Sequence, residues 1–271
     1  FAQKHMPVFV DQLGRKLSIA STPKRIISLV PSQTELLYDL GIEDEVIGIT
    51  KFCIHPDHWF QSKTRIGGTK NLKLEKIKAM QPHLIIANKE ENVKEQIDTL
   101  AEHFPVWISD INTLDEALQM INEIGNITGY GSRAVEIAEH IKERFKSFSK
   151  SKVLNKYRTA YLIWKDPYMT VGGDTFINHI LKMTGFENLF ESQARYPVID
   201  MDSLSALNCE LLLLSSEPFP FSEKHIKALQ QQLPKTKILL VDGEMFSWYG
   251  SRLLHTPAYL KGLQQQIAAI S

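Results

Sequence analysis

Residues 25–41, RIISLVPSQTELLYDLG, decide the fold class of this chain. The run RIISLV (25–30) is short and rich in β-branched residues, and it ends at Pro31. The residues after it have the spacing of a helix, with Ser32 and Glu35 placed as a capping box and Gly41 as the stop. A strand, a turn and a helix in this order predict an α/β protein.

The same alternation continues on the C-terminal side of this unit. Strands are expected at VIGIT (46–50), LIIAN (84–88) and PVWIS (105–109), with helices at LEKIKAM (74–80) and NVKEQIDTLAEH (92–103). Because helical crossovers join parallel strands, this pattern predicts a mostly parallel sheet covered on both faces.

From Thr113 the pattern becomes helical for nearly forty residues, and strands return only near Arg158. The second strand region contains RTAYLIW (158–164), ELLLLSS (210–216) and KILLVD (237–242), separated by helical segments and followed by a helix after Pro257. We therefore expect two Rossmann-like α/β lobes joined by a single long backbone helix: an N-terminal lobe over 1–128, the linking helix over 129–152 and a C-terminal lobe over 153–271.

The amino-acid composition argues against some classes of function. With 43% apolar residues in 271, the chain can form a large core, and 31 basic against 31 acidic residues give no general attraction to nucleic acid. The sequence contains no run of eighteen apolar residues, so no transmembrane segment is predicted. The two cysteines, Cys53 and Cys209, fall in different halves, which disfavours a disulfide between them.

The common catalytic motifs are missing from the sequence. There is no GxSxG elbow, phosphate-binding GxxxxGK[ST], HExxH or paired CxxC. The segment GYGSRA (129–134) imitates a dinucleotide fingerprint, but it follows a helix and is interpreted as a helix break. These observations favour a protein that is not an enzyme and has no intrinsic cofactor.

One loop, KFCIHPDHW (51–59), gathers Cys53, His55 and His58. Thiolate and imidazole groups this close could bind a transition metal. The alternative, which we favour, is an ordinary loop with a half-buried thiol and exposed imidazoles, because no second cluster of ligands occurs elsewhere in the sequence.

Aromatic side chains collect in predicted loops at strand ends, where parallel sheets bind ligands. The segments WKDPY (164–168) and EMFSWYGSR (244–252) mix rings with charges, which suggests a binding site for a large, partly apolar ligand. The candidate ligand-binding residues are Phe52, His55, Trp164, Tyr168, Tyr196, Glu244, Phe246, Trp248, Tyr249 and Arg252. For any single ring, plain packing in the core is an equally good reading.

The two halves of the chain resemble each other locally. LEKIKAMQPHLII (74–86) aligns without gaps on MDSLSALNCELLL (201–213), and each segment has an acidic residue in second place, Glu75 and Asp202. Any helix-turn-strand unit would share the apolar spacing, but the shared acid is not explained in that way.

Three longer segments, FVDQLGRKLSI, TPKRIISLVPSQTELLYDLGI and GGTKNLKLEKIKAMQPHLIIA, resemble the N-terminal lobe of class III substrate-binding proteins of ABC importers. These are helical-backbone receptors for vitamin B12, ferric siderophores and haem. The resemblance continues through VGGDTFINHILKMTGFENLF and EMFSWYGSRLLHTPAYL, so it covers almost the whole chain, and it is greatest to vitamin B12-binding proteins.

The resemblance implies a function and partners. We expect a periplasmic or membrane-anchored extracytoplasmic monomer that binds cobalamin or a related corrinoid between its lobes and delivers it to an ABC transporter permease. Glu75 and Asp202 match the acids that dock into permease arginines in that family, and Phe52, Tyr168 and Tyr196 match its aromatic cradle, with Trp164 close by. An iron chelate such as a ferric siderophore, haem or a bare metal is the alternative ligand.

This sequence departs from the family pattern at several ring positions. Gly67-Gly68 and Asn88 stand where the vitamin B12 binders have tryptophans, and His55 stands at another usual aromatic place, while Trp248 adds a ring at a usually polar one. An intracellular carrier or enzyme on the same fold is a further alternative, since no export signal is visible and the native start could be Met6.

Overall fold

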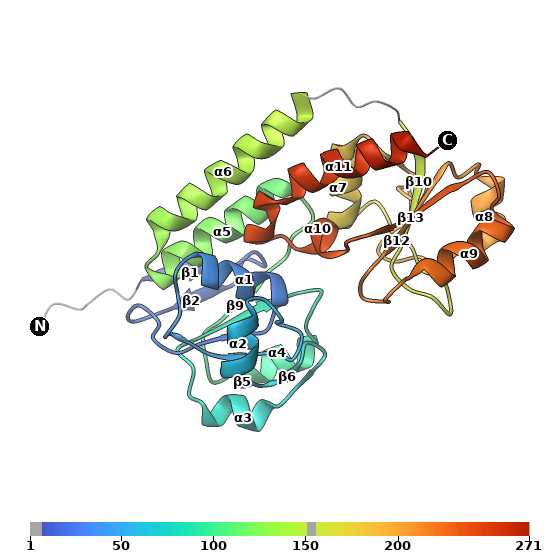
Figure 1. Ribbon diagram of the computed structural model, residues 1–271. Helices are drawn as coiled ribbons and strands as arrows, with labels where there is room; N and C mark the ends of the chain where they lie inside the picture. The colour runs from blue at the N-terminus through green and yellow to red at the C-terminus, as the bar shows by residue number, and fades with distance from the viewer. Residues whose placement is uncertain (1–6, 151–155, 271) are drawn as a thin grey trace, which may run out of the picture. The chain divides into compact units, whose positions relative to one another are not determined.

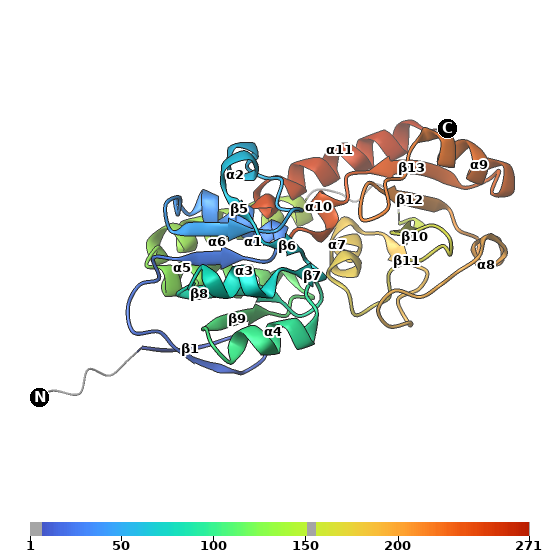
Figure 2. The same cartoon turned by 90° about the horizontal axis from the view of Figure 1, so that it is seen from below.

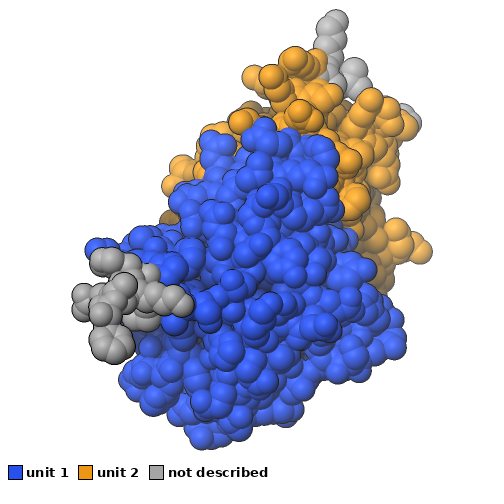
Figure 3. All heavy atoms as spheres, turned by 90° about the vertical axis from the view of Figure 1, so that its left-hand side faces the viewer, with its two compact units in different colours: residues 1–111, 115–141, 249–252 blue, residues 112–114, 142–248, 253–271 orange. Residues whose placement is uncertain are grey.

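The computed structural model describes residues 7–150 and 156–270. These residues form two compact units, coloured separately in Figure 3. Among the described residues, unit 1 consists of 7–111, 115–141 and 249–252, and unit 2 of 112–114, 142–150, 156–248 and 253–270. The expected boundary at 152/153 and the alternative start at Met6 lie outside the described residues.

Unit 1, whose residues 7–111 are coloured from blue to green in Figure 1, is built on a five-stranded parallel sheet. The strand order of this sheet is β5-β4-β3-β8-β9. Its strands are β3 (Ile26–Ser28), β4 (Val46–Ile49), β5 (Thr64–Arg65), β8 (Leu84–Asn88) and β9 (Val106–Ser109). Two antiparallel pairs accompany the sheet: β1 (Val8–Val10) with β2 (Lys16–Ser18), and β6 (Gly67–Gly68) with β7 (Asn71–Leu72).

Four helices connect these strands: α1 (Pro31–Asp39), α2 (Asp57–Ser62), α3 (Leu74–Ala79) and α4 (Lys94–Ala101). One face of the sheet presents alternate residues such as Ile85 and Ala87, which pack with Ile77 of α3 and Leu100 of α4 in one buried cluster. Figure 2 shows α3 and α4 alongside β8 and β9. The period-two alternation of the strands therefore places α3 against the sheet.

Unit 2 repeats this plan with a four-stranded parallel sheet in the order β11-β10-β12-β13. Its strands are β10 (Arg158–Leu162), β11 (Glu187–Asn188), β12 (Leu211–Ser215) and β13 (Lys237–Val241). Its helices are α7 (Phe176–Thr184), α8 (Met201–Ala206), α9 (Glu223–Gln232), α10 (Glu244–Ser247) and α11 (Thr256–Ala269), with a 3₁₀ turn at Ser251–Leu254.

Two long helices, α5 (Leu114–Thr128) and α6 (Gly131–Lys150), occupy the region between the strand-bearing segments. Gly129, with φ +84°, separates them, so GYGSRA is a helix break as expected. Helix α6 begins in unit 1 and, from Lys142, belongs to unit 2. Two parallel-sheet units with this helix pair confirm the predicted α/β class.

The start of α1 differs from the expectation. The helix begins at Pro31 with Val30 as its N-cap and no side-chain cap, so Ser32 lies inside the helix and forms no capping box with Glu35. Proline at the first helical position supplies a suitable backbone angle without a capping side chain. Gly41, with φ +88°, does end the segment.

Candidate functional site

In unit 1, the predicted ligand residues Phe52 and His55 lie in the loop that follows β4. Phe52 is 50% exposed, and Lys51 Nζ lies 5.0 Å from the centroid of its ring. The Phe52 N–H donates to Thr50 Oγ1 at 3.3 Å, which fixes the loop next to the strand end. His55 is half-buried. An exposed ring beside a cation at a strand end is suited to contact with a ligand.

In unit 2, Trp164 and Tyr168 lie in the loop after β10. The sheet order places β10 next to the position where the chain changes direction, with β11 on one side and β12 on the other, and such switch points bind ligands in open α/β sheets. Trp164 is 39% exposed, and Tyr168 is half-buried. Isolated bridges pair Trp164 with Met169 and Met169 with Val198, which extends this surface.

Tyr196 lies in the loop after β11 and is half-buried, with the Arg195 guanidinium 5.6 Å from its ring centroid. Phe219 was not among the residues predicted from the sequence, and its ring packs edge-to-face on Trp164 with 5.8 Å between the ring centroids. The Phe219 N–H donates to Ile163 O at 3.2 Å. The signal for it was the apolar EPFPF segment directly after β12.

The segment EMFSWYGSR does not behave as one ligand surface. Phe246 has no exposed surface and packs against Tyr161 at 5.1 Å and Tyr259 at 6.3 Å between ring centroids. The predicted ligand contact of Phe246 is therefore wrong, because a fully enclosed ring cannot touch a ligand unless the core repacks. Trp248 and Tyr249 are also buried.

Trp248 belongs to a polar cluster around Glu217. Its Nε1–H donates to Glu217 Oε1 at 3.0 Å, and Ser247 Oγ donates to the same oxygen at 2.8 Å. Burial raises the pKa of Glu217, and the nearby Glu244 carboxylate raises it further, while the hydrogen bond from Ser247 opposes the shift. The Glu244 N–H donates to Asp242 Oδ1 at 3.0 Å, and Glu244 is half-buried.

Arg252 makes a bidentate ion pair with Glu35 inside unit 1. Its Nε and Nη2 donate to the two carboxylate oxygens at 3.0 and 2.6 Å. Burial raises the pKa of Glu35, and the hydrogen bond and charge of Arg252 oppose that shift. The guanidinium thus has a structural partner in addition to the ligand role predicted for it.

The residues Cys53, His55 and His58 do not converge. The Cys53 thiol is fully buried and lies 3.1 Å from both Thr34 Oγ1 and Thr50 Oγ1, and burial raises its pKa. His58 is exposed, with Nε2 3.5 Å from Glu43. Over residues 7–150 and 156–270, no group of three His, Cys, Asp or Glu side chains is placed to hold a metal ion.

Asn88 and the Gly67-Gly68 stretch, where the resemblance leads us to expect tryptophans in vitamin B12 binders, have local structural roles. The Asn88 amide donates to Ser109 O and Oγ, and its Oδ1 accepts the N–H groups of Glu90 and Glu91. Gly67 has φ +108°, and a Cβ there would lie 2.4 Å from Asn71 O. Neither position can take a tryptophan without a local rearrangement.

Glu75 and Asp202, the predicted docking acids, occupy equivalent places in the two units. Glu75 lies in the first turn of α3 with its side chain 86% exposed and 3.1 Å from Lys78 Nζ. Asp202 lies in the first turn of α8 and is exposed. A carboxylate in the first turn complements the positive end of the helix dipole.

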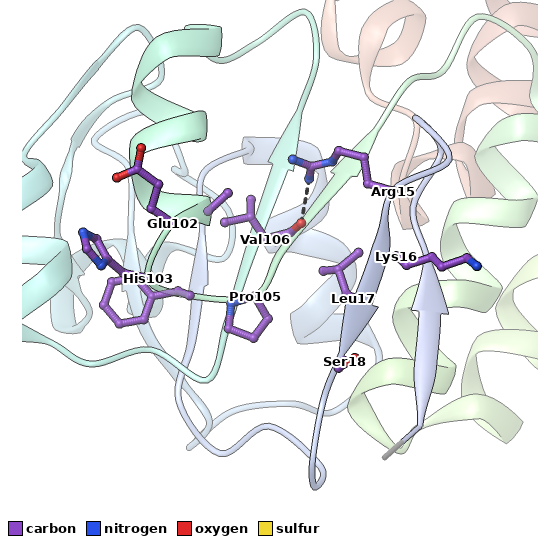
Figure 4. A pocket seen from close by; sticks show the side chains of 10 residues that line it. Arg15, Lys16, Leu17, Ser18, Glu102, His103, Pro105 and Val106 are labelled. Carbon is purple, nitrogen blue, oxygen red and sulfur yellow. Dashed lines mark hydrogen bonds between the residues drawn. The ribbon is translucent and has the colours of Figure 1, made fainter. Parts of the chain in front are cut away.

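A separate open pocket of about 450 Å³ lies in unit 1 between the β1–β2 hairpin and the end of α4 (Figure 4). Arg15, Lys16, His103 and Val106 are among its lining residues, and Arg15 Nη2 donates to Val106 O at 2.7 Å. None of the predicted ligand or docking residues lines it. No helix in the described parts of the chain is long and apolar enough to span a bilayer.

Comparison with known proteins identifies the relatives of this chain. The vitamin B12-binding protein of Vibrio parahaemolyticus is 26% identical over 215 residues, which are 78% of this chain and 76% of that protein. The structure is similar to the periplasmic vitamin B12-binding protein of Vibrio cholerae, with a TM-score of 0.78, 18% identity and coverage of 92% and 99% of the two chains.

A third similarity is to a protein that is described as binding a different ligand. The periplasmic catecholate-siderophore-binding protein of Vibrio cholerae has a TM-score of 0.79 and 15% identity, over 95% of this chain and all of that one. The family model described as periplasmic binding protein matches residues 26–239. The chain therefore belongs to the periplasmic binding protein family, as a class III, extracytoplasmic substrate-binding protein of an ABC importer and not an enzyme.

Proposed function

We propose that this protein binds cobalamin or a related corrinoid and delivers it to its ABC permease. The carrying observation is that exposed rings lie in the loops at the carboxyl ends of the strands of each unit: Phe52 in unit 1 and Trp164 in unit 2. The exposed parts of these rings are apolar surface in contact with water. A flat, partly apolar ligand that covered them would gain about 25 cal/mol of binding free energy per Å² of apolar surface removed from water. The similarity to vitamin B12-binding proteins supports the same ligand class.

A titration with cyanocobalamin tests this proposal. We expect stoichiometric binding at micromolar concentration, with quenching of tryptophan fluorescence. Trp164→Ala should weaken binding at least tenfold, about 1.4 kcal/mol, because an aromatic anchor is removed. Tyr38→Ala is the matched control: Tyr38 is also 39% exposed, but it lies on α1 and not in a loop after a strand. The absence of quenching and of retained corrinoid would refute the corrinoid assignment.

A ferric siderophore is the second candidate ligand. It is supported by the cations beside two of the predicted ligand rings, Lys51 at Phe52 and Arg195 at Tyr196, because a ferric tris-catecholate is an anion. The absence of the expected aromatic rings at the Gly67-Gly68 stretch and at Asn88 also fits a ligand other than cobalamin. A parallel titration with a ferric catecholate complex separates the two, and Lys51→Gln with Arg195→Gln should weaken only the binding of the anion.

Docking on the permease is proposed to use Glu75 and Asp202. Both carboxylates are exposed on short helices at equivalent places, and paired charges of this kind orient a complex and make its affinity depend on salt. Glu75→Lys with Asp202→Lys should leave ligand binding intact and abolish uptake in a reconstituted importer.

The matched controls for docking are Glu95→Lys and Glu223→Lys, which reverse exposed acids in the first turns of α4 and α9, one in each unit. Uptake with these controls should be that of the unmodified protein. Undiminished uptake by the Glu75/Asp202 variant would show that the two acids are ordinary surface charges.

A further inference from the structure

The acid-bearing helices of the two units belong to an internal repeat that includes backbone geometry. Helices α3 and α8 begin at 74 and 201, and strands β8 and β12 begin at 84 and 211, so each boundary is displaced by 127 positions. The turn between helix and strand contains a left-handed residue at the same displacement, Gln81 with φ 45° and Asn208 with φ 51°.

In unit 1, Arg25 fastens the end of the acid-bearing helix to the sheet. Arg25 directly precedes β3, and its Nε donates to Met80 O, the C-cap carbonyl of α3, at 3.1 Å, with Nη2 donating to the same oxygen. The backbone carbonyl of Arg25 accepts the His83 N–H at 2.7 Å, just before β8 begins. One residue thus holds both the end of α3 and the start of the next strand.

In unit 2, Arg158 makes the same set of bonds. Arg158 is the first residue of β10, and its Nε and Nη2 donate to Leu207 O, the C-cap carbonyl of α8, at 3.3 and 2.8 Å. Its backbone carbonyl accepts the Glu210 N–H at 2.9 Å. Leu207 and Glu210 are the counterparts of Met80 and His83 at the same displacement of 127.

Helices of six residues cannot keep a fixed direction by themselves, because isolated helices this short are unstable in water. A guanidinium on the terminal carbonyl satisfies an otherwise unpaired acceptor and complements the negative end of the helix dipole. Because Arg25 directly precedes an inner strand and Arg158 begins one, each arginine transfers the position of the sheet to the short helix and to the acid in its first turn.

We propose that Arg25 and Arg158 are paired positioning residues, which hold α3 and α8 so that Glu75 and Asp202 reach the permease in a fixed orientation. The inference rests on the proposed docking role of those two acids. The arginines act through the helices, so their effect on permease binding depends on the acids being present.

The test measures the Kd of the ligand-free, full-length protein for its cognate ABC permease in nanodiscs. Arg25→Ala and Arg158→Ala should each raise this Kd about tenfold, which is 1.4 kcal/mol. Arg25→Lys should recover part of the loss, because lysine keeps the charge but lacks the planar fork. Thermal unfolding of each variant identifies any that fail to fold, and the lysine variants then carry the test.

Each unit offers a matched control. Arg133 Nε donates to Asp39 O at 3.3 Å in unit 1, and Arg144 Nη1 donates to Leu254 O at 2.6 Å in unit 2. Both are exposed arginines on α6 that bond a backbone carbonyl away from the acid-bearing helices. Arg133→Ala and Arg144→Ala should leave the Kd unchanged.

A double-mutant cycle distinguishes positioning from a general structural effect. In a Glu75→Gln background, Arg25→Ala should no longer raise the Kd, because the group that it positions has been removed. An equal effect of Arg25→Ala in both backgrounds would overturn the inference, as would arginine variants that match the controls. If the Glu75→Gln and Asp202→Asn variants bind the permease with the same Kd as the unmodified protein, the docking proposal itself fails.

Discussion

Arg252→Ala should reveal the dependence of unit 1 on the buried pair between Glu35 and Arg252. The two side chains are 17% and 13% exposed, and the substitution removes both guanidinium bonds from a carboxylate that remains enclosed. Breaking one partner of such a pair costs about 3 kcal/mol in the free energy of unfolding at neutral pH, mostly because a charge is left buried without compensation.

The pH dependence of this loss follows from the pKa of Glu35. Burial already raises that pKa above the ordinary 4.5, so the folded state holds a proton more strongly than the unfolded state. The stability that comes from proton binding to Glu35 is therefore fully present below the pKa of Glu35 in the unfolded state. It is lost as pH rises through the pKa of Glu35 in the folded state. Without Arg252 the folded pKa rises further, so the loss should be small near pH 4 and largest near pH 7.

Urea unfolding at pH 4 and pH 7 measures this difference. Glu35→Gln in the Arg252→Ala background should recover part of the stability at pH 7, because an amide buries no charge. The exposed pair of Arg133 with Glu136, at 2.7 Å, provides the control, and Arg133→Ala should leave the unfolding free energy unchanged within error. A loss of unfolding free energy below about 1 kcal/mol at pH 7, or an equal loss at both pH values, would show that the buried pair does not stabilise unit 1 in this way.

Three further predictions concern single positions. Gly67→Ala should lower the unfolding free energy by about 1–3 kcal/mol, measured by denaturant titration, because the new Cβ meets Asn71 O at a left-handed φ; an unchanged midpoint would contradict this. Cys53 and Cys209 should resist alkylation by iodoacetamide at pH 8 until the chain is unfolded, because both thiols are buried and burial raises their pKa, for Cys209 to about 11. Rapid alkylation of the native protein, measured by mass spectrometry, would disprove their burial. Asp200→Ala should lower the hydrogen-exchange protection of the α8 amides, because it removes the N-cap. Because hydrogen bonds lower the pKa of Asp200, acidification through that lowered pKa should reduce the protection factors, after correction for the intrinsic exchange rate, only in the unmodified protein; equal protection in both proteins would count against the cap.

The spacing of apolar residues along the chain was sufficient to predict the main strands and helices. The apolar runs at 84–88 and 210–216 became the central strands β8 and β12, and the gapless alignment of 74–86 on 201–213 corresponds to a shared helix, left-handed turn and strand. Local backbone preferences and burial of alternate residues determine such elements, so a single sequence carries them.

The residues of the candidate site could be predicted only in part, because local patterns do not show which side chains meet in the folded chain. Phe52 and Trp164 were placed in loops and are exposed there, but Phe246, in an equally aromatic segment, belongs to the core. A pattern of rings does not state which ring meets another one, and that is decided by neighbours distant in the sequence, such as Tyr161 for Phe246 and Phe219 for Trp164.

Patterns of residue types were enough to predict the alternation of strands and helices, the repeat of the two units and the equivalent places of Glu75 and Asp202. The pairing of Arg252 with Glu35, and the bonds of Arg25 and Arg158 to the ends of the acid-bearing helices, became visible only in the folded chain. These contacts join residues 49 to 217 positions apart. Their formation depends on the packing of whole units, because no local pattern of residue types encodes which distant carbonyl or carboxylate a guanidinium will meet.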